Sequence, residues 1–267
     1  MNIILLGLIQ GFTEFLPVSS SGHLVIFEHF LGISNPDLSL EIALHLGTLG
    51  SVLVYFHKKI ISLIKAFIGI IINTIAPKKS PFISVNFSDE KSMIISLIIA
   101  MIPTAIIGLF LRKNISDFHQ LSMVGIALLF TSILLFASNI SLHKKKSRTN
   151  KVSTWQGILI GIAQGIAVIP GISRSGSTVA TALILGLNRQ SAAEFSFLLA
   201  IPTILAATLL EFNAAVVFTP LIGLAVLTSF VSGLIAIHFF MEIIKRSSLN
   251  IFAFYCLFLG MLLLLFS

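Results

Sequence analysis

Charged residues are scarce in this chain. Lys, Arg, Asp and Glu together make up 10% of its 267 residues, whereas a soluble domain carries about 25%, so a soluble globular protein is excluded. The chain has a single cysteine, Cys256, which rules out an internal disulfide. No Lys or Arg occurs before Lys58, so the apolar N-terminus lacks the positive region of an ordinary signal peptide.

Apolar residues take the place of the missing charges. They make up 56% of the sequence, and the mean hydropathy is +1.05. A spanning helix needs about 20 apolar residues, and runs of this kind leave little sequence for a separate soluble domain. We therefore expect an all-α polytopic membrane protein that forms one membrane domain over residues 1–267. The net charge of +7 does not indicate nucleic-acid binding, because the basic residues form short clusters between apolar runs, as orientation signals do.

Six apolar runs are expected to form full transmembrane helices: 40–57, 92–111, 119–142, 192–211, 215–241 and 249–266. The most basic loop, 143–151, is assigned to the cytoplasm because cytoplasmic loops carry an excess of Lys and Arg. Lys58-Lys59 and Lys78-Lys79 then both fall on that side, so the run 60–76 is expected to be an interfacial helix. Both termini are extracytoplasmic in this arrangement.

Two further apolar stretches are too short to cross a membrane and are broken by turn-forming residues. Residues 1–16 lead into the loop PVSSSG, and residues 153–169 lead into Pro170-Gly171. A second short run follows each break, at 23–31 and at 177–187. Irregular backbone is tolerated at membrane depth only where it is buried in protein or lines a wet cavity. Each stretch therefore predicts a re-entrant helix–loop–helix hairpin.

The two hairpins are related by an internal repeat. Residues 7–32 align with 161–186 without a gap, with identities at Gly7/Gly161, Gln10/Gln164, Gly11/Gly165, Ser19/Ser173, Ser21/Ser175, Gly22/Gly176, Val25/Val179, Leu31/Leu185 and Gly32/Gly186. The first copy is assigned to the outer side and the second to the inner side, so we expect an inverted-topology repeat. Its first unit covers about residues 1–142 and its second about 152–267. The alternative is chance similarity between two apolar segments rich in Gly and Ser.

The positions that differ between the copies carry the ionisable groups. The alignment pairs Glu14 with Val168, Ser20 with Arg174, and His23 with Ser177. One copy thus supplies an acid and a histidine, and the other supplies a guanidinium. A symmetric structural hairpin does not need this division, whereas a composite active site does. Ionisable residues within membrane segments are functional candidates by default.

Gln10 and Glu14 are four residues apart and share one helix face. Their oxygens suit a hard divalent cation such as Mg²⁺ or Ca²⁺. The alternative for Glu14 is a carboxylate paired with a buried base.

Both Ser/Gly loops precede a helix, where free backbone N–H groups and hydroxyls suit a phosphate anion. Arg174 adds a bidentate donor that matches phosphate oxygens. The expected phosphate contacts are Ser19, Ser21, Gly22, Gly171, Ser173, Ser175 and Thr178. Helix capping is the alternative and is the commoner role of such serines. It does not account for Arg174, which needs a partner in an apolar half-helix.

His23 directly follows the first loop, where it is a candidate nucleophile or general acid or base. A structural role is the alternative. The remaining histidines lack such company and are expected to be structural or interfacial: His29, His45, His57, His119, His143 and His238. Acid, cation, histidine, serine and arginine together indicate phosphoryl transfer, in which positive groups meet the charge on the phosphoryl oxygens. A site within the bilayer suits a substrate with a lipid tail.

The segments GFTEFLPVSSSGH, PGISRSGST and EFSFLLAIP resemble the signature segments of the undecaprenyl-diphosphate phosphatase family, the bacitracin-resistance (BacA/UppP) type. The resemblance runs through nearly the whole chain. It implies a multi-pass enzyme of the bacterial plasma membrane that removes the terminal phosphate of undecaprenyl diphosphate and so recycles the lipid carrier for peptidoglycan synthesis. It also implies a divalent cation, a site that faces the extracytoplasmic side, and bacitracin resistance.

The resemblance also implies roles for single residues. The acidic pair of the family falls on Gln10 and Glu14, and the glutamine at the first position places more weight on Glu14. The loop serine falls on Ser20, and whether Ser20, His23 or water attacks phosphorus stays open. The family's histidine is His23, and its second motif is matched by Ser173, Arg174 and Thr178. The alternative function is a polyprenyl-phosphate flippase that uses the inverted repeat. The expected partners are a polyprenyl diphosphate and membrane lipid, and the sequence is compatible with a homodimer.

Overall fold

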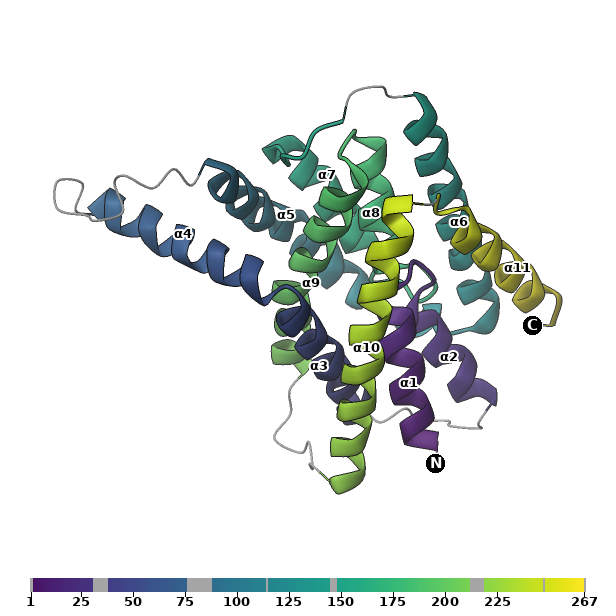
Figure 1. The fold of residues 1–267 in the computed structure, drawn as a ribbon. Coiled ribbons are helices and arrows are strands. Elements are labelled where there is room, and N and C mark those ends of the chain that lie inside the picture. Colours follow the sequence, from purple (N-terminus) through teal and green to yellow (C-terminus); the bar gives the residue numbers. More distant parts are fainter. Residues whose placement is uncertain are drawn as a thin grey trace.

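The computed structural model describes residues 2–30, 38–75, 88–113, 115–144, 148–211, 219–246 and 248–266 (Figure 1). The α-helices are α1 (Asn2–Phe15), α2 (Ser20–Phe30), α3 (Leu38–Tyr55), α4 (His57–Ile75), α5 (Ser88–Arg112), α6 (Leu121–Lys144), α7 (Thr154–Ile166), α8 (Arg174–Ile184), α9 (Arg189–Glu211), α10 (Pro220–Arg246) and α11 (Asn250–Phe266). A short 3₁₀ turn covers Ile115–Phe118, and one isolated bridge joins Thr149 to Leu187. The prediction of an all-α protein is confirmed.

Four helices among the described residues are long and apolar enough to cross a membrane: α5, α6, α9 and α10. Of the six expected spans, the other two correspond to shorter apolar helices, Leu40–Tyr55 in α3 and Asn250–Phe266 in α11. Large apolar side chains point outward from the bundle, such as Phe110 and Ile133, which are 71% and 67% exposed. An outer surface of this kind is stable only against lipid. The chain is therefore a polytopic membrane protein.

The two interrupted stretches form pairs of short helices, as the sequence predicts. α1 and α2 flank the first loop, and α7 and α8 flank the second. The helix α8 begins at Arg174, three residues earlier than expected. Ser173 explains this, because its extended backbone and its Oγ, which accepts from Gly176 N at 3.0 Å, cap the helix at that point.

The first helix of each pair packs closely along a long helix that is distant in sequence. α1 lies against α10, and α7 lies against α5 (Figure 1). Glycines allow the approach: a Cβ at Gly11 would lie 2.6 Å from Ser229 O, and a Cβ at Gly161 would lie 2.8 Å from Ala100 Cα. Small residues at such crossings are how membrane helices bring their backbones together.

The helix α4 projects from the bundle toward the left of Figure 1, and it covers most of the run expected to be interfacial. Lys78 and Lys79, on which part of that expectation rests, lie outside the described residues, as do residues 145–147 of the basic loop.

The packed core lies beside the loops. Phe15, fully buried next to Glu14, meets Phe197 of α9 edge to face at 5.5 Å between ring centroids. Such aromatic pairs are favourable beyond the area they bury, so this contact fixes the end of α1 near α9.

Candidate active site

The two Ser/Gly loops meet in the interior of the protein. Ser19 Oγ accepts a hydrogen bond from Gly171 N at 3.1 Å, and Ser175 Oγ donates to Leu16 O at 3.0 Å. A Cβ at Gly22 would lie 3.0 Å from Gly171 Cα, so the absence of a side chain lets the loops touch. The first loop is thereby joined to the second across about 150 residues of sequence.

Left-handed backbone occurs in both loops. Ser19 has φ 67° and Gly171 has φ 94°. For a residue other than glycine this conformation is uncommon and often marks a functional turn. The turn directs Ser19 Oγ toward two backbone amides, Gly22 N at 3.2 Å and Gly171 N. Ser19 Oγ therefore stabilises the loop conformation through hydrogen bonds to both α2 and the second loop.

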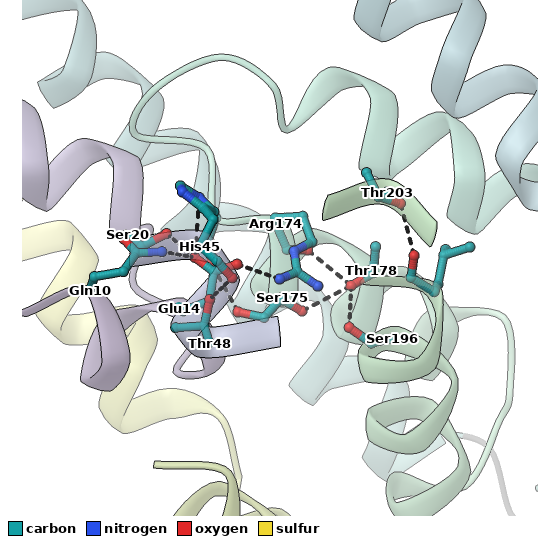
Figure 2. A network of polar contacts seen from close by, with 12 residues as sticks. Gln10, Glu14, Ser20, His45, Thr48, Arg174, Ser175, Thr178, Ser196 and Thr203 are labelled. Atoms are coloured by element: carbon teal, nitrogen blue, oxygen red, sulfur yellow. Dashed lines mark hydrogen bonds and ion pairs between the residues drawn. The ribbon is translucent and has the colours of Figure 1, made fainter. Parts of the chain in front are cut away.

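Glu14 lies at the centre of the polar network (Figure 2). Its Oε1 accepts from Arg174 Nη2 at 2.5 Å. Its Oε2 accepts from Ser20 Oγ at 2.5 Å and from Gln10 Nε2 at 2.9 Å. The structure thus brings together four residues that the sequence predicts as catalytic or metal-binding, three from the first repeat unit and one from the second.

Two buried atoms of this network have no hydrogen-bond partner: Arg174 Nη1 and Gln10 Oε1. A salt bridge between Glu14 and Arg174 alone is compatible with a structural role. Buried polar atoms are nearly always hydrogen-bonded in folded proteins, and an unsatisfied one costs about 1–3 kcal/mol. One spare donor and one spare acceptor beside an ion pair indicate a site that is completed by a ligand.

His23 is turned away from this network. Its Nδ1 contacts Ser19 O at 2.7 Å, and its Nε2 contacts the hydroxyl of Tyr255 at 2.6 Å. A carbonyl only accepts, so Nδ1 carries the proton and the neutral ring accepts at Nε2. The Tyr255 ring stacks on the imidazole, with 5.7 Å between centroids. His23 thus holds the first loop, and any direct part in the chemistry stays a prediction.

The hydroxyls expected to bind phosphate make hydrogen bonds within and between the loops, and their contact with phosphate stays a prediction. Thr178 Oγ1 donates to Arg174 O at 2.9 Å and contacts Ser196 Oγ at 2.5 Å. Ser173 caps α8, and its backbone N–H donates to Thr131 Oγ1 at 3.0 Å. Ser21 Oγ lies 3.4 Å from Ser19 Oγ. The capping interpretation of these serines is confirmed for Ser173.

Two residues that sequence reasoning left aside reach the site. His45 of α3 places Nε2 3.8 Å from Glu14 Oε2, and Tyr255 of α11 contacts His23. No local motif marks either residue, because each reaches the site only through the packing of separate helices. The sequence predicts a structural or interfacial role for His45, because it lacks the adjacent hydroxyls and acid that accompany His23.

The fit to a divalent cation is partial. Among the described residues no three His, Cys, Asp or Glu side chains converge to hold a metal. The oxygens present are the Glu14 carboxylate, the unpartnered Gln10 Oε1 and Ser20 Oγ. Mg²⁺ is commonly bound by one or two carboxylates together with substrate phosphates and water. The donors fit a cation held jointly by protein and substrate, and they do not fit an all-protein cage.

Fold and site together define a polytopic membrane protein with a buried acid–arginine pair between two Ser/Gly loops. The chain belongs to the family described as bacitracin resistance protein BacA, whose sequence profile matches residues 3–262.

Relatives in the family are similar over their full length. A protein of Desulfatibacillum aliphaticivorans named undecaprenyl-diphosphatase is 41% identical, over an alignment of 268 positions that covers 97% of this chain and 96% of that protein. Proteins of the same name from Syntrophotalea carbinolica and Methanosphaera stadtmanae are 40% and 39% identical, over 97% and 100% of this chain and 96% and 98% of their own length.

Proposed function

We propose that this protein is a hydrolase that removes the terminal phosphate of undecaprenyl diphosphate and releases undecaprenyl phosphate. Relatives at about 40% identity over the full chain carry the name of this activity, and the site holds the acid, hydroxyl and guanidinium that phosphoryl transfer uses. The activity returns the lipid carrier to envelope synthesis, and it relates the protein to bacitracin resistance through its family. The relatives' name supports hydrolysis rather than lipid translocation.

The observation that carries the proposal is the contact of Ser20 Oγ with Glu14 Oε2 beside an arginine that has a spare donor. A carboxylate that accepts from a hydroxyl at 2.5 Å is placed to take its proton. Arg174 Nη1 supplies the donor for a phosphate oxygen, since it is buried and has no protein partner. Among the nucleophiles that the sequence leaves open, this geometry favours Ser20.

In the first step Ser20 Oγ bonds to the terminal phosphorus while its proton passes to Glu14. The bond between that phosphorus and the bridging oxygen breaks, and the electron pair stays on the oxygen of the departing undecaprenyl phosphate, which takes the proton from Glu14. In the second step water bonds to the phosphorus of phosphoserine and gives a proton to Glu14, the bond between phosphorus and Ser20 Oγ breaks, phosphate leaves, and Ser20 Oγ takes that proton from Glu14. Arg174 holds the phosphoryl oxygens throughout.

Glu14, Gln10 and Ser20 would hold a divalent cation, Mg²⁺ or Ca²⁺, together with the substrate. When bound, the cation supplies positive charge against the diphosphate oxygens. His23 and the Ser19 backbone keep the loop in the conformation that points Ser20 at Glu14.

The transmembrane arrangement is proposed as six spans, two re-entrant hairpins and an inverted repeat within one domain. The packing between the two units supports this arrangement. The helix α1 of the first unit lies on α10 of the second, and α7 of the second unit lies on α5 of the first. The matched glycines Gly11 and Gly165 both lie at these crossings. The site then faces the extracytoplasmic side of the bacterial plasma membrane, and the polyprenyl chain lies in the bilayer.

The test is release of phosphate from undecaprenyl diphosphate by the purified protein in nanodiscs. Glu14→Gln and Ser20→Ala should each lower kcat by about 100-fold or more, because each removes a partner of the proton transfer. Glu242→Gln is the matched control, since Glu242 forms an exposed ion pair with Lys245. Activity within about twofold of wild type in both site variants would contradict the assignment. Absence of phosphate release from the wild-type protein would contradict the function.

A further inference from the structure

His45 approaches Glu14 from a third helix. His45 lies on α3, whereas Glu14 lies on α1 and Arg174 on α8. His45 Nε2 is 3.8 Å from Glu14 Oε2, the oxygen that also accepts from Gln10 and Ser20. Figure 2 shows the imidazole and Arg174 approaching the carboxylate from different sides. The His45 side chain is 31% exposed and that of Glu14 is 5% exposed, so the imidazole lies on the more accessible side of the carboxylate.

The other ring nitrogen determines what Nε2 presents to Glu14. His45 Nδ1 lies 2.9 Å from Glu41 O. A carbonyl oxygen only accepts, so Nδ1 carries the ring proton, and in the neutral ring Nε2 presents its lone pair. The gap of 3.8 Å between Nε2 and Glu14 Oε2 exceeds the range of a direct N–H···O bond, about 2.7–3.2 Å. A cation that binds both the ring nitrogen and the carboxylate oxygen would fit this separation.

We propose that His45 Nε2 is a nitrogen ligand of the divalent cation of this site, opposite Glu14. The inference rests on the proposed function, which places a cation at Glu14 and Gln10. Two bonds of about 2.1 Å, the usual length to nitrogen or oxygen, are long enough to bridge the gap. The unpartnered Gln10 Oε1 supplies a further oxygen on the same face of α1, four residues before Glu14. Nδ1 bonded to a backbone carbonyl is the arrangement that orients a metal-binding histidine.

The identity of the preferred ion follows from this ligand. Oxygen ligands alone suit Mg²⁺ and Ca²⁺, whereas imidazole nitrogen favours transition metals such as Zn²⁺. Mn²⁺ accepts both kinds of ligand and has a spectroscopic signal. The site should therefore bind Mn²⁺ and Zn²⁺ more tightly than Ca²⁺, and His45 should be the reason for the difference.

The experiment measures Mn²⁺ binding to the purified full-length protein with any oligohistidine tag removed, without substrate. Electron spin echo modulation reports ¹⁴N coupling to bound Mn²⁺, and competition with Zn²⁺ and Ca²⁺ gives their Kd values. His45→Gln replaces the nitrogen with an amide that offers oxygen. It should abolish the ¹⁴N coupling and weaken Zn²⁺ binding at least about tenfold, with Ca²⁺ binding changed by less than about threefold.

His119→Gln is the matched control. His119 is exposed, and its Nδ1 contacts Ile115 O at 2.9 Å, the same local geometry as in His45. This variant should keep the wild-type coupling and Kd values. Coupling that persists in His45→Gln, or that is absent from Mn²⁺ bound to wild type, would overturn the inference, as would a wild type that binds no Mn²⁺. Phosphate release in the presence of chelator is measured in parallel. This assay distinguishes a failure of the proposed hydrolysis from a failure of His45 to bind the cation.

Discussion

At the scale of single residues, the expected role of the arginine in the second loop requires both terminal nitrogens of its guanidinium group. Arg174 places Nη2 on Glu14 while Nη1 stays buried and available. A lysine carries the same charge but has a single nitrogen, so it cannot serve a carboxylate and a phosphate in the same planar geometry.

Arg174→Lys should therefore lower kcat/KM for undecaprenyl diphosphate by about 100-fold, since removal of one donor to a developing anion costs about 10²–10³. Steady-state phosphate release measures the effect, and Arg246→Lys, at an exposed position on α10, is the control. Activity of Arg174→Lys close to that of wild type would show that charge alone suffices.

Tyr255 acts on the first loop through His23. Its hydroxyl donates to Nε2 at 2.6 Å, while the opposite ring nitrogen donates to Ser19 O. Tyr255→Phe keeps the stacked ring and leaves Nε2 without its donor, which costs about 1–3 kcal/mol where the group is buried. We expect kcat to fall about tenfold, measured by phosphate release.

Tyr55→Phe is the control for that experiment, because Tyr55 is the other tyrosine of the chain and its ring packs on Phe56. In a His23→Gln background, Tyr255→Phe should have no further effect, as expected for residues that act through one contact. Additive losses would contradict the coupling.

At the scale of elements, the half-length helices pack closely on the long helices through faces that carry glycine. α7 meets α5 at Gly157, Gly161 and Gly165, where added Cβ atoms would reach the facing helix. In lipid no hydrophobic effect drives helices together, so they associate through close van der Waals packing of this kind. The short helices therefore hold the loops in place through contact with the long ones.

Gly161→Ala should destabilise the protein by about 1–3 kcal/mol, the usual cost of overpacking, because the methyl group would press on the backbone of Ala100. Thermal unfolding in detergent followed by circular dichroism measures it. Gly223→Ala on α10 is the control: no atom lies within 4 Å of its added Cβ, and alanine favours helix. Equal melting temperatures for Gly161→Ala and wild type would contradict the close crossing.

At the scale of the whole molecule, the two repeat units contribute unequally to one site. The acid, the serine and the amide come from the first unit and the guanidinium from the second, and the loops meet at Ser19 and Gly171. In the proposed inverted topology, the two loops approach each other from opposite faces of the membrane. The proposed topology follows from this requirement together with the positive-inside rule.

Cysteine labelling of intact cells tests this topology in a Cys256→Ser background. Phe266→Cys, at the 83% exposed end of α11, should react with a membrane-impermeant maleimide, because the proposed topology places the C-terminus on the extracytoplasmic side. Lys151→Cys in the basic loop should react only after the cells are permeabilised. The reverse pattern would invert the orientation of the site.

The sequence by itself determined the class, the helices and most of the site. Scarcity of charge and long apolar runs indicated a membrane protein, because each span must satisfy its own backbone hydrogen bonds and needs a fixed length. The repeat with unequal residues at Glu14 and Arg174 predicted a composite site, and the structure joins these two residues directly.

Only the tertiary structure decided which polar groups meet. It turned His23 toward Tyr255, assigned Ser173 to a helix cap, and brought His45 to Glu14. The contacts of His23 and His45 join separate helices, and their direction depends on helix packing and on hydrogen bonds that satisfy buried groups. Local spacing carries information about one helix face, and it carries none about which other helix that face will meet.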